Sequence, residues 1–143
     1  MKMTQDITLE PGMEHLIQKK VAYEDTTVSF GRAGIETLFS TPALVSMMIE
    51  ACVDLVGFSV PDGHITVARS MQLTHEKATL QGMTVTVKAT IDRIENNVIY
   101  FDLICFDEIG QIAKGRMERH IVNKDALIKR AHERAKSLDD MNR

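Results

Sequence analysis

The stretch STPALVSMMIEACVDLVG, residues 40–57, stands out because it is apolar almost throughout. A hydroxyl residue followed by proline, as at Thr41 and Pro42, is typical of an N-cap and first helical position, and Gly57 is a typical C-terminal stop. Three polar side chains lie between Pro42 and Gly57, each four positions from the next: Ser46, Glu50 and Asp54. That spacing places them on one narrow stripe. The pattern predicts a long core helix, enclosed on every side except the stripe.

The segments around this helix predict an antiparallel sheet. Residues 15–23 alternate loosely, as in a first long strand, and residues 24–39 are expected to form an irregular loop. After the Pro-Asp-Gly turn at 61–63, four strand-like segments follow, at about 64–75, 83–95, 98–106 and 112–122. Turn residues between them predict consecutive hairpins, so we expect a meander, followed by a surface helix from about residue 124.

This order of elements is that of an α+β fold in which one sheet encloses one apolar helix. The length of 143 residues fits a single domain, which we expect to span residues 1–143 with the C-terminal helix as its last element. Such a sheet has edge strands that need covering, and pairing between two copies would cover them. We therefore expect a homodimer.

Composition and charge exclude several classes of function. The net charge of −3, from 17 basic and 20 acidic residues, gives no electrostatic footprint for nucleic acid. No apolar run is long enough to span a bilayer, and the first residues lack an apolar export segment, so we expect a cytoplasmic chain without membrane contact. Cys52 and Cys105 are then expected to be buried, reduced thiols. The five histidines and two cysteines lack metal-ligand spacing, so we expect no metal site.

Three segments resemble the family of fluoroacetyl-CoA-thioesterase-like hot-dog proteins. They are FSTPALVSMMIEAC on the helix, LTHEKATLQGMTVTVKA after it, and GRMERHIV in the last strand. The similarity runs from about Gly12 to Lys129. Its most specific part is the THxxAxxxGxxVxV stretch that begins at Thr74 and His75. The resemblance implies a hot-dog fold, a central helix wrapped by an antiparallel sheet.

The same resemblance implies a dimeric hydrolase of small acyl-CoA thioesters, without a separate cofactor, whose active site lies at the dimer interface. Members use a threonine at the helix start, a glutamate within the helix and a histidine on the following strand. The threonine carries over to Thr41 and the histidine to His75. Arg119 matches another position near the site, where it would either pair with a carboxylate in the sheet or bind the coenzyme. Thr41 would supply a nucleophile or position a water beside helix N-terminal amides, and His75 would act as general base.

The sequence departs from the family at three positions. The family's glutamate falls on Ile49, and the carboxylate present, Glu50, is one position later, a rotation of about 100° on an α-helix. Glu50 would reach the same pocket only through a shift or bulge of the helix; otherwise it belongs to the polar stripe. Ala68 replaces a glycine, and its added methyl group would narrow either the acyl pocket or the approach of the backbone to the thioester. Ile35 stands where the fluoroacetyl-specific member has phenylalanine, so nothing supports a fluorinated substrate.

Three functions follow from these residues. The first is hydrolysis of a small acyl-CoA by Thr41 and His75, with Glu50 or a water in place of the missing carboxylate, and with Ala68, Arg119 and Ile35 contacting the substrate. The second is a non-hydrolytic protein that binds acyl-CoA or a related small ligand. The third is a purely structural dimerisation domain.

Overall fold

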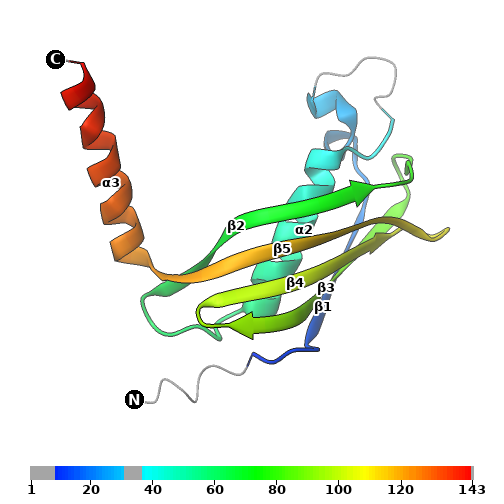
Figure 1. Ribbon diagram of the computed structural model, residues 1–143. Helices are drawn as coiled ribbons and strands as arrows, with labels where there is room; N and C mark the ends of the chain where they lie inside the picture. Colours follow the sequence, from blue (N-terminus) through cyan, green and yellow to red (C-terminus); the bar gives the residue numbers. More distant parts are fainter. Residues whose placement is uncertain (1–8, 31–36, 143) are drawn as a thin grey trace.

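The apolar stretch folds as α2 (Thr41–Val56) in the computed structural model, which describes residues 9–30 and 37–142 (Figure 1). The predicted helix is confirmed, but its predicted N-cap is wrong by one residue. Ser40, not Thr41, is the N-cap: its backbone is extended and its hydroxyl accepts a hydrogen bond of 3.2 Å from the Ala43 N–H. Thr41 is already helical, so its hydroxyl is not needed as a cap.

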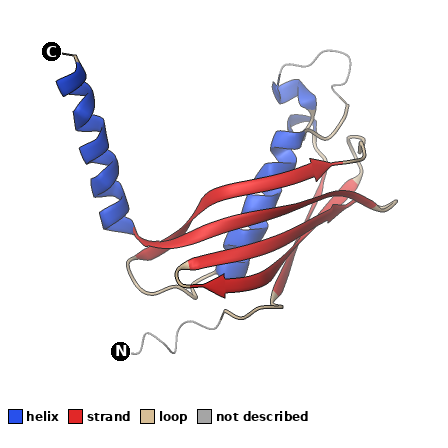
Figure 2. Ribbon diagram, viewed as in Figure 1, coloured by secondary structure: helices blue, strands red, loops and turns tan. Residues whose placement is uncertain are grey.

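Five strands form one antiparallel sheet on one face of α2, as Figure 2 shows. The two short turns η1 (Tyr23–Asp25) and η2 (Thr27–Phe30) precede α2. The strands are β1 (Glu14–Lys20), β2 (His64–His75), β3 (Thr84–Glu95), β4 (Val98–Phe106) and β5 (Gln111–Asn123). The four predicted later strands agree with these bounds to within one residue, whereas β1 ends three residues early because the chain continues into η1.

The predicted meander is correct only for β3, β4 and β5. The order across the sheet is β1-β3-β4-β5-β2, so β2 pairs with β5 instead of β3. β1 precedes the helix in the chain and occupies the place beside β3. The segment between β2 and β3 is long enough to cross the end of the sheet, so the two strands need not form a hairpin. β2 is consequently an edge strand with one side unpaired within the described chain.

The core lies between α2 and the sheet. Leu44, Met48, Ala51 and Cys52 of α2 are fully buried. In β3 alternate side chains are buried: Val85, Val87, Ala89 and Ile91. The prediction that α2 is enclosed on all its apolar sides is wrong for the single chain. Ile49 is 37% exposed and Val53 is 43% exposed. One sheet covers only one face of a helix, so this second apolar side lacks a cover.

The chain ends in α3 (Lys124–Met141), the predicted C-terminal helix, whose first turn is capped by the Asn123 side chain. Figure 2 shows it projecting away from the sheet as a separate rod. No helix within residues 9–30 and 37–142 has both the length and the apolar character needed to cross a membrane.

Gly115, in the middle of β5, tests the close packing of β2 on β5. A Cβ at this position would lie 2.6 Å from the Gln72 carbonyl oxygen, closer than van der Waals contact permits. We expect Gly115→Ala to lower the free energy of unfolding by about 1–3 kcal/mol, because backbone must move to accept the methyl group. Thermal unfolding measures the effect. Gly110→Ala is the matched control, since a Cβ there meets nothing within 4 Å; equal melting temperatures for the two variants would contradict the packing.

Candidate active site

Thr41 and His75 meet at one end of the sheet, although they are 34 positions apart in the sequence. Thr41 Oγ1 and His75 Nδ1 are 2.8 Å apart, a hydrogen bond between the first helical residue of α2 and the last residue of β2. The Ser40 cap makes this contact possible, because it leaves the Thr41 hydroxyl available. The structure thus brings together the two residues that the family resemblance had singled out.

A short ladder of backbone hydrogen bonds holds the two elements in register. The Phe39 N–H donates to the Thr79 carbonyl and the Gln81 N–H to the Thr37 carbonyl, both at 2.8 Å. The Thr79 side chain is fully buried and donates to Asp107 at 2.8 Å, which anchors this segment to the turn between β4 and β5. The segment before α2 is therefore fixed against the segment after β2, and the position of Thr41 relative to His75 follows from it.

The His75 ring is partly enclosed. Phe39, only 3% exposed, lies edge-on to it with ring centroids 6.2 Å apart and planes at 72°. The Nε2 atom is buried and has no hydrogen-bond partner among the described residues. Burial lowers the pKa of His75 below its ordinary value of 6.5, and the nearby Lys77 backbone opposes this effect in part. The imidazole is therefore neutral near pH 7, and the tautomer that carries its proton on Nε2 can accept a proton from Thr41 at Nδ1.

One backbone donor remains at the start of α2. The Ala43 N–H is bound to the Ser40 hydroxyl and Pro42 has no N–H. The Thr41 N–H is the first-turn amide for which the described residues offer no acceptor. The helix start therefore presents a single amide, rather than the several amides expected from sequence, beside the Thr41 hydroxyl.

The helix carboxylate is not brought to this pair. α2 is an uninterrupted α-helix, without the bulge that would bring Glu50 into the pocket. Nine positions after Thr41, Glu50 is on the opposite side of the helix, where it lines a hollow with Lys19, Asp25 and Ser46. Ile49 is about 80° from Thr41 around the helix but eight residues, or about 12 Å, further along its axis, so it does not lie beside the pair within one chain.

Ala68 and Arg119 lie far from His75 within one chain. They are paired across β2 and β5, and Ala68 is seven residues from His75, about 23 Å along a strand. Arg119 is only 5% exposed; it donates to the Thr66 hydroxyl at 3.1 Å and to the Thr66 carbonyl at 3.0 Å. No acidic side chain of the described residues forms an ion pair with it. Apart from the family resemblance, nothing in the sequence indicated that the guanidinium of Arg119 would be buried.

The two thiols are buried, as expected. Burial raises the pKa of Cys52 to about 12, although neighbouring Arg119 opposes the rise, and burial together with Asp107 raises that of Cys105 to about 12.

No cluster of three potential metal ligands occurs within the described ranges. Ile35, expected to contact the substrate, lies outside the described residues. Sequence reasoning missed Ser40, Phe39 and Thr66, because their roles depend on contacts made by the folded chain.

A five-stranded antiparallel sheet packed on a long helix is the hot-dog fold, and solved structures share it. A hot-dog-like protein from Thermanaerovibrio acidaminovorans superimposes with a TM-score of 0.83 and 28% identity, over 94% of this chain and 97% of that one. A thioesterase-superfamily protein from Thermus thermophilus gives 0.79 and 25%, over 90% and 96%. A variant of the fluoroacetyl-CoA-specific thioesterase gives 0.81 and 21%, over 88% and 97%.

Residues 21–125 match the family model of FlK, the fluoroacetyl-CoA-specific thioesterase. This is well over half of the chain, and the protein belongs to that family. The fluoroacetyl-CoA thioesterase of Streptantibioticus cattleyicolor is 28% identical over 86 residues, which are 60% of this chain and 62% of that relative. The match therefore spans less than two thirds of the relative's length.

The lowered pKa of His75 gives a prediction with a definite sign. The folded chain binds a proton at His75 less readily than the unfolded chain, so this residue's contribution to stability is complete above pH 6.5 and is lost as the pH falls below it. We expect the NMR titration midpoint of His75 to lie below 6.5. We also expect the stability advantage of the wild type over His75→Gln to shrink as the pH falls from about 7.5 to about 5, a range that includes the ordinary pKa of histidine. A midpoint at or above 6.5 would contradict the burial of this ring.

Proposed function

We propose that this protein hydrolyses a small acyl-CoA thioester to the free acid and CoA, with Thr41 and His75 as the reacting pair. The observation that carries the proposal is the 2.8 Å hydrogen bond between a hydroxyl group and an imidazole whose pKa is lowered by burial. Membership of the thioesterase family and the named activity of the Streptantibioticus relative support it.

The chemistry needs a nucleophile, a base and an oxyanion donor. Thr41 Oγ1 positions a water, or attacks directly, and the proton passes to His75 Nδ1 as the new bond to the thioester carbon forms. The Thr41 N–H is available to the developing oxyanion. The carbon–sulfur bond then breaks and the departing thiolate takes the proton back from His75. When Thr41 acts as the nucleophile, water attacks the acyl-threonine in a second step with the same base.

Two subunits complete the site in this proposal. Ala68 and Arg119 are too far from His75 to share a substrate with it within one chain. If β2 pairs antiparallel with β2 of a second copy, around a two-fold axis near Met71 and Gln72, each His75 comes beside the partner subunit's Ala68. The unpaired edge of β2 and the exposed Ile49 and Val53 on the uncovered side of α2 support such a homodimer.

A groove lies at the end of the sheet that would face the partner's His75. It has a volume of about 570 Å³ and is lined by Val53, Phe58, Ile65, Thr66 and neighbouring residues. Phe58 is 99% exposed, and Thr66 connects the groove to the guanidinium of Arg119. In this proposal the groove takes the acyl group or the adjoining part of CoA, while Arg119 supplies positive charge behind it.

The remaining properties follow from the same proposal. The reaction needs no cofactor, because nucleophile, base and oxyanion donor are protein groups. We place the protein in the cytoplasm, where reduced buried thiols such as Cys52 and Cys105 are the rule and acyl-CoA substrates are available. Neither nucleic acid nor a membrane is a partner.

One observation favours a second function, binding of an acyl-CoA or related ligand without turnover. His75 Nε2 lacks a partner in the described chain, and Ile49 stands where the family has a carboxylate. Without an acceptor at Nε2, the imidazolium formed during catalysis is less stabilised. Calorimetry that detects tight acyl-CoA binding without release of free CoA would establish this alternative in place of hydrolysis.

We expect the wild type to release CoA from a panel of short and medium acyl-CoAs, measured with a thiol reagent, and His75→Ala to reduce the rate by at least about 100-fold. Hydrolysis that is unaffected by His75→Ala would contradict the mechanism. Arg119→Met should also inactivate, while the apolar replacement of a buried charge keeps the fold.

Mixing these two inactive variants tests whether the site is shared. A dimer of one His75→Ala chain and one Arg119→Met chain holds one intact site, since His75 of the second chain faces Arg119 of the first. Random exchange of subunits should restore about one quarter of wild-type activity. If both residues serve a site within one chain, no activity returns, and the two-subunit arrangement is wrong. Far-UV circular dichroism of each variant checks that it is folded.

A carboxylate at position 49 should increase activity. Ile49 is partly exposed on the uncovered side of α2, so Ile49→Glu is expected to fold. In the proposed homodimer we expect it to raise kcat by about tenfold or more, by placing a carboxylate at the interface where it stabilises the imidazolium of a His75 of either subunit. Val53→Glu is the matched control, because it places the same side chain one turn further along the same helix. Equal rates for the two variants would show that position 49 has no special relation to His75.

A further inference from the structure

α3 is a long helix that, beyond its start, packs on no other element of the described residues. From Ile128 to Asn142 every residue is exposed, and its contact with the body is confined to its start beside β5. In proteins most of the stability of a helix comes from the packing of one of its faces rather than from helix propensity, so a partner surface would stabilise this one.

One side of α3 is apolar from Ile128 to Leu138. This stripe consists of Ile128, Ala131, Ala135 and Leu138, at intervals of three, four and three residues. Such spacing is that of a helix-packing seam, and the two central alanines allow close approach of another backbone. Ile128 is 45% and Leu138 60% exposed.

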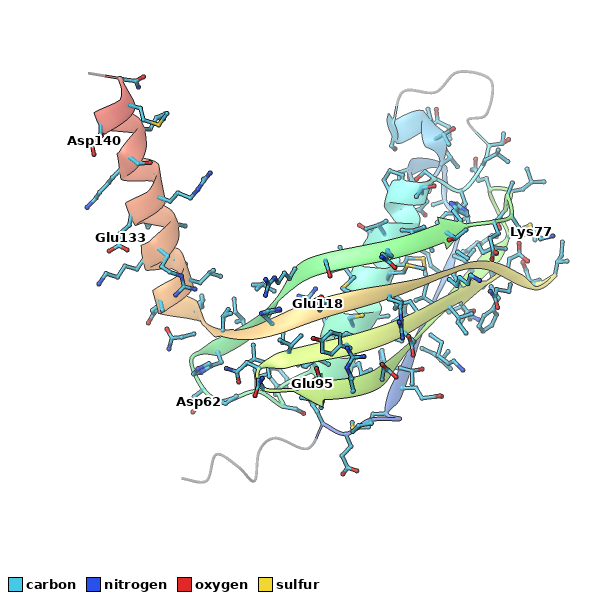
Figure 3. All side chains as sticks on the ribbon, in the orientation of Figure 1. Asp62, Lys77, Glu95, Glu118, Glu133 and Asp140 are labelled. Atoms are coloured by element: carbon cyan, nitrogen blue, oxygen red, sulfur yellow. The ribbon has the colours of Figure 1, made fainter. Side chains whose placement is uncertain are left out.

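The opposite side of α3 is charged, with Lys129, Glu133, Lys136 and Asp140. Figure 3 shows Glu133 and Asp140 on the side turned away from the sheet. The stripe therefore faces the space beside the unpaired edge of β2, where α3 rises past that edge in Figure 1.

The position of α3 identifies what would occupy this space. α3 follows Asn123, which pairs with His64 at the start of β2. In an antiparallel β2–β2 pair that overlaps most of the strand, His64 of one chain lies beside residues 75–79 of the other. The root of α3 is then next to the end of the second chain that holds His75, where Leu80 is 54% exposed.

We infer that α3 is an intersubunit arm: its apolar stripe packs on a second copy of this chain, beside the end of β2 that carries His75. The inference rests on the homodimer of the proposed function and adds a second contact to it. Each arm packs on the segment after β2 of the other subunit, the segment whose Thr79 and Gln81 are hydrogen-bonded to residues before α2. The C-terminal helix of one chain thereby contacts the active-site end of the other.

The first test uses the wild-type protein. A sample mixed from isotope-labelled and unlabelled chains is examined by isotope-filtered NMR for contacts between subunits. We expect contacts from the methyl groups of Ile128 and Leu138 to protons of the other chain. Contacts restricted to the same chain, in a protein that is dimeric by light scattering, would overturn the inference and leave the β2-mediated dimer intact.

The second test compares two substitutions that introduce the same side chain. Ala135→Glu places a charge in the stripe, whereas Ser137→Glu places it outside the stripe. We expect the dimer dissociation constant to rise at least about tenfold for Ala135→Glu and to stay unchanged for Ser137→Glu. Equal dissociation constants would overturn the inference. A monomeric wild type would overturn both this inference and the proposed dimer, while the CoA-release assay tests hydrolysis separately.

Discussion

The packing of α2 on the inner face of the sheet is the constraint on which the rest of the structure depends. Leu44, Met48, Ala51 and Cys52 exclude water on the helix side, and alternate residues of β3 do so on the sheet side. Because the helix must lie across this face, the strands before and after it are directed to opposite edges of the sheet. β2 therefore ends beside the start of α2, and the two candidate reacting groups meet there.

The active-site contact depends on a competition between two possible caps. Ser40 and Thr41 are both good N-cap residues, and proline is tolerated in the first turn after either. The folded chain favours Ser40, whose N–H donates to the Asp25 carbonyl at 2.9 Å and whose side chain is buried. This choice aligns the Thr41 hydroxyl with His75 and also consumes the Ala43 amide. The geometry of the site is thus a consequence of how the preceding loop is anchored.

Local patterns were sufficient to predict α2, α3 and the four later strands, because their periodicity and turn residues act over short distances. They were insufficient for the placement of β2, which depends on the route of the chain around the helix. The exposure of Ile49 and Val53 also escaped prediction, since apolar sequence shows that a surface needs a cover but not whether the same chain supplies it. The meeting of Thr41 and His75 was anticipated only through the family resemblance. The position of Glu50, away from Thr41 and His75, then follows from the regular geometry of α2.

The buried thiols have a consequence for a protein proposed to release a thiol. With pKa values of about 12, Cys52 and Cys105 carry a thiolate fraction of only about 10⁻⁵ at pH 7, and neither is accessible to solvent. Free coenzyme A that accumulates and oxidises would find no nucleophile on this protein with which to form a mixed disulfide. The core packing that determines the fold thus also keeps the two thiols from reacting with coenzyme A, the expected product.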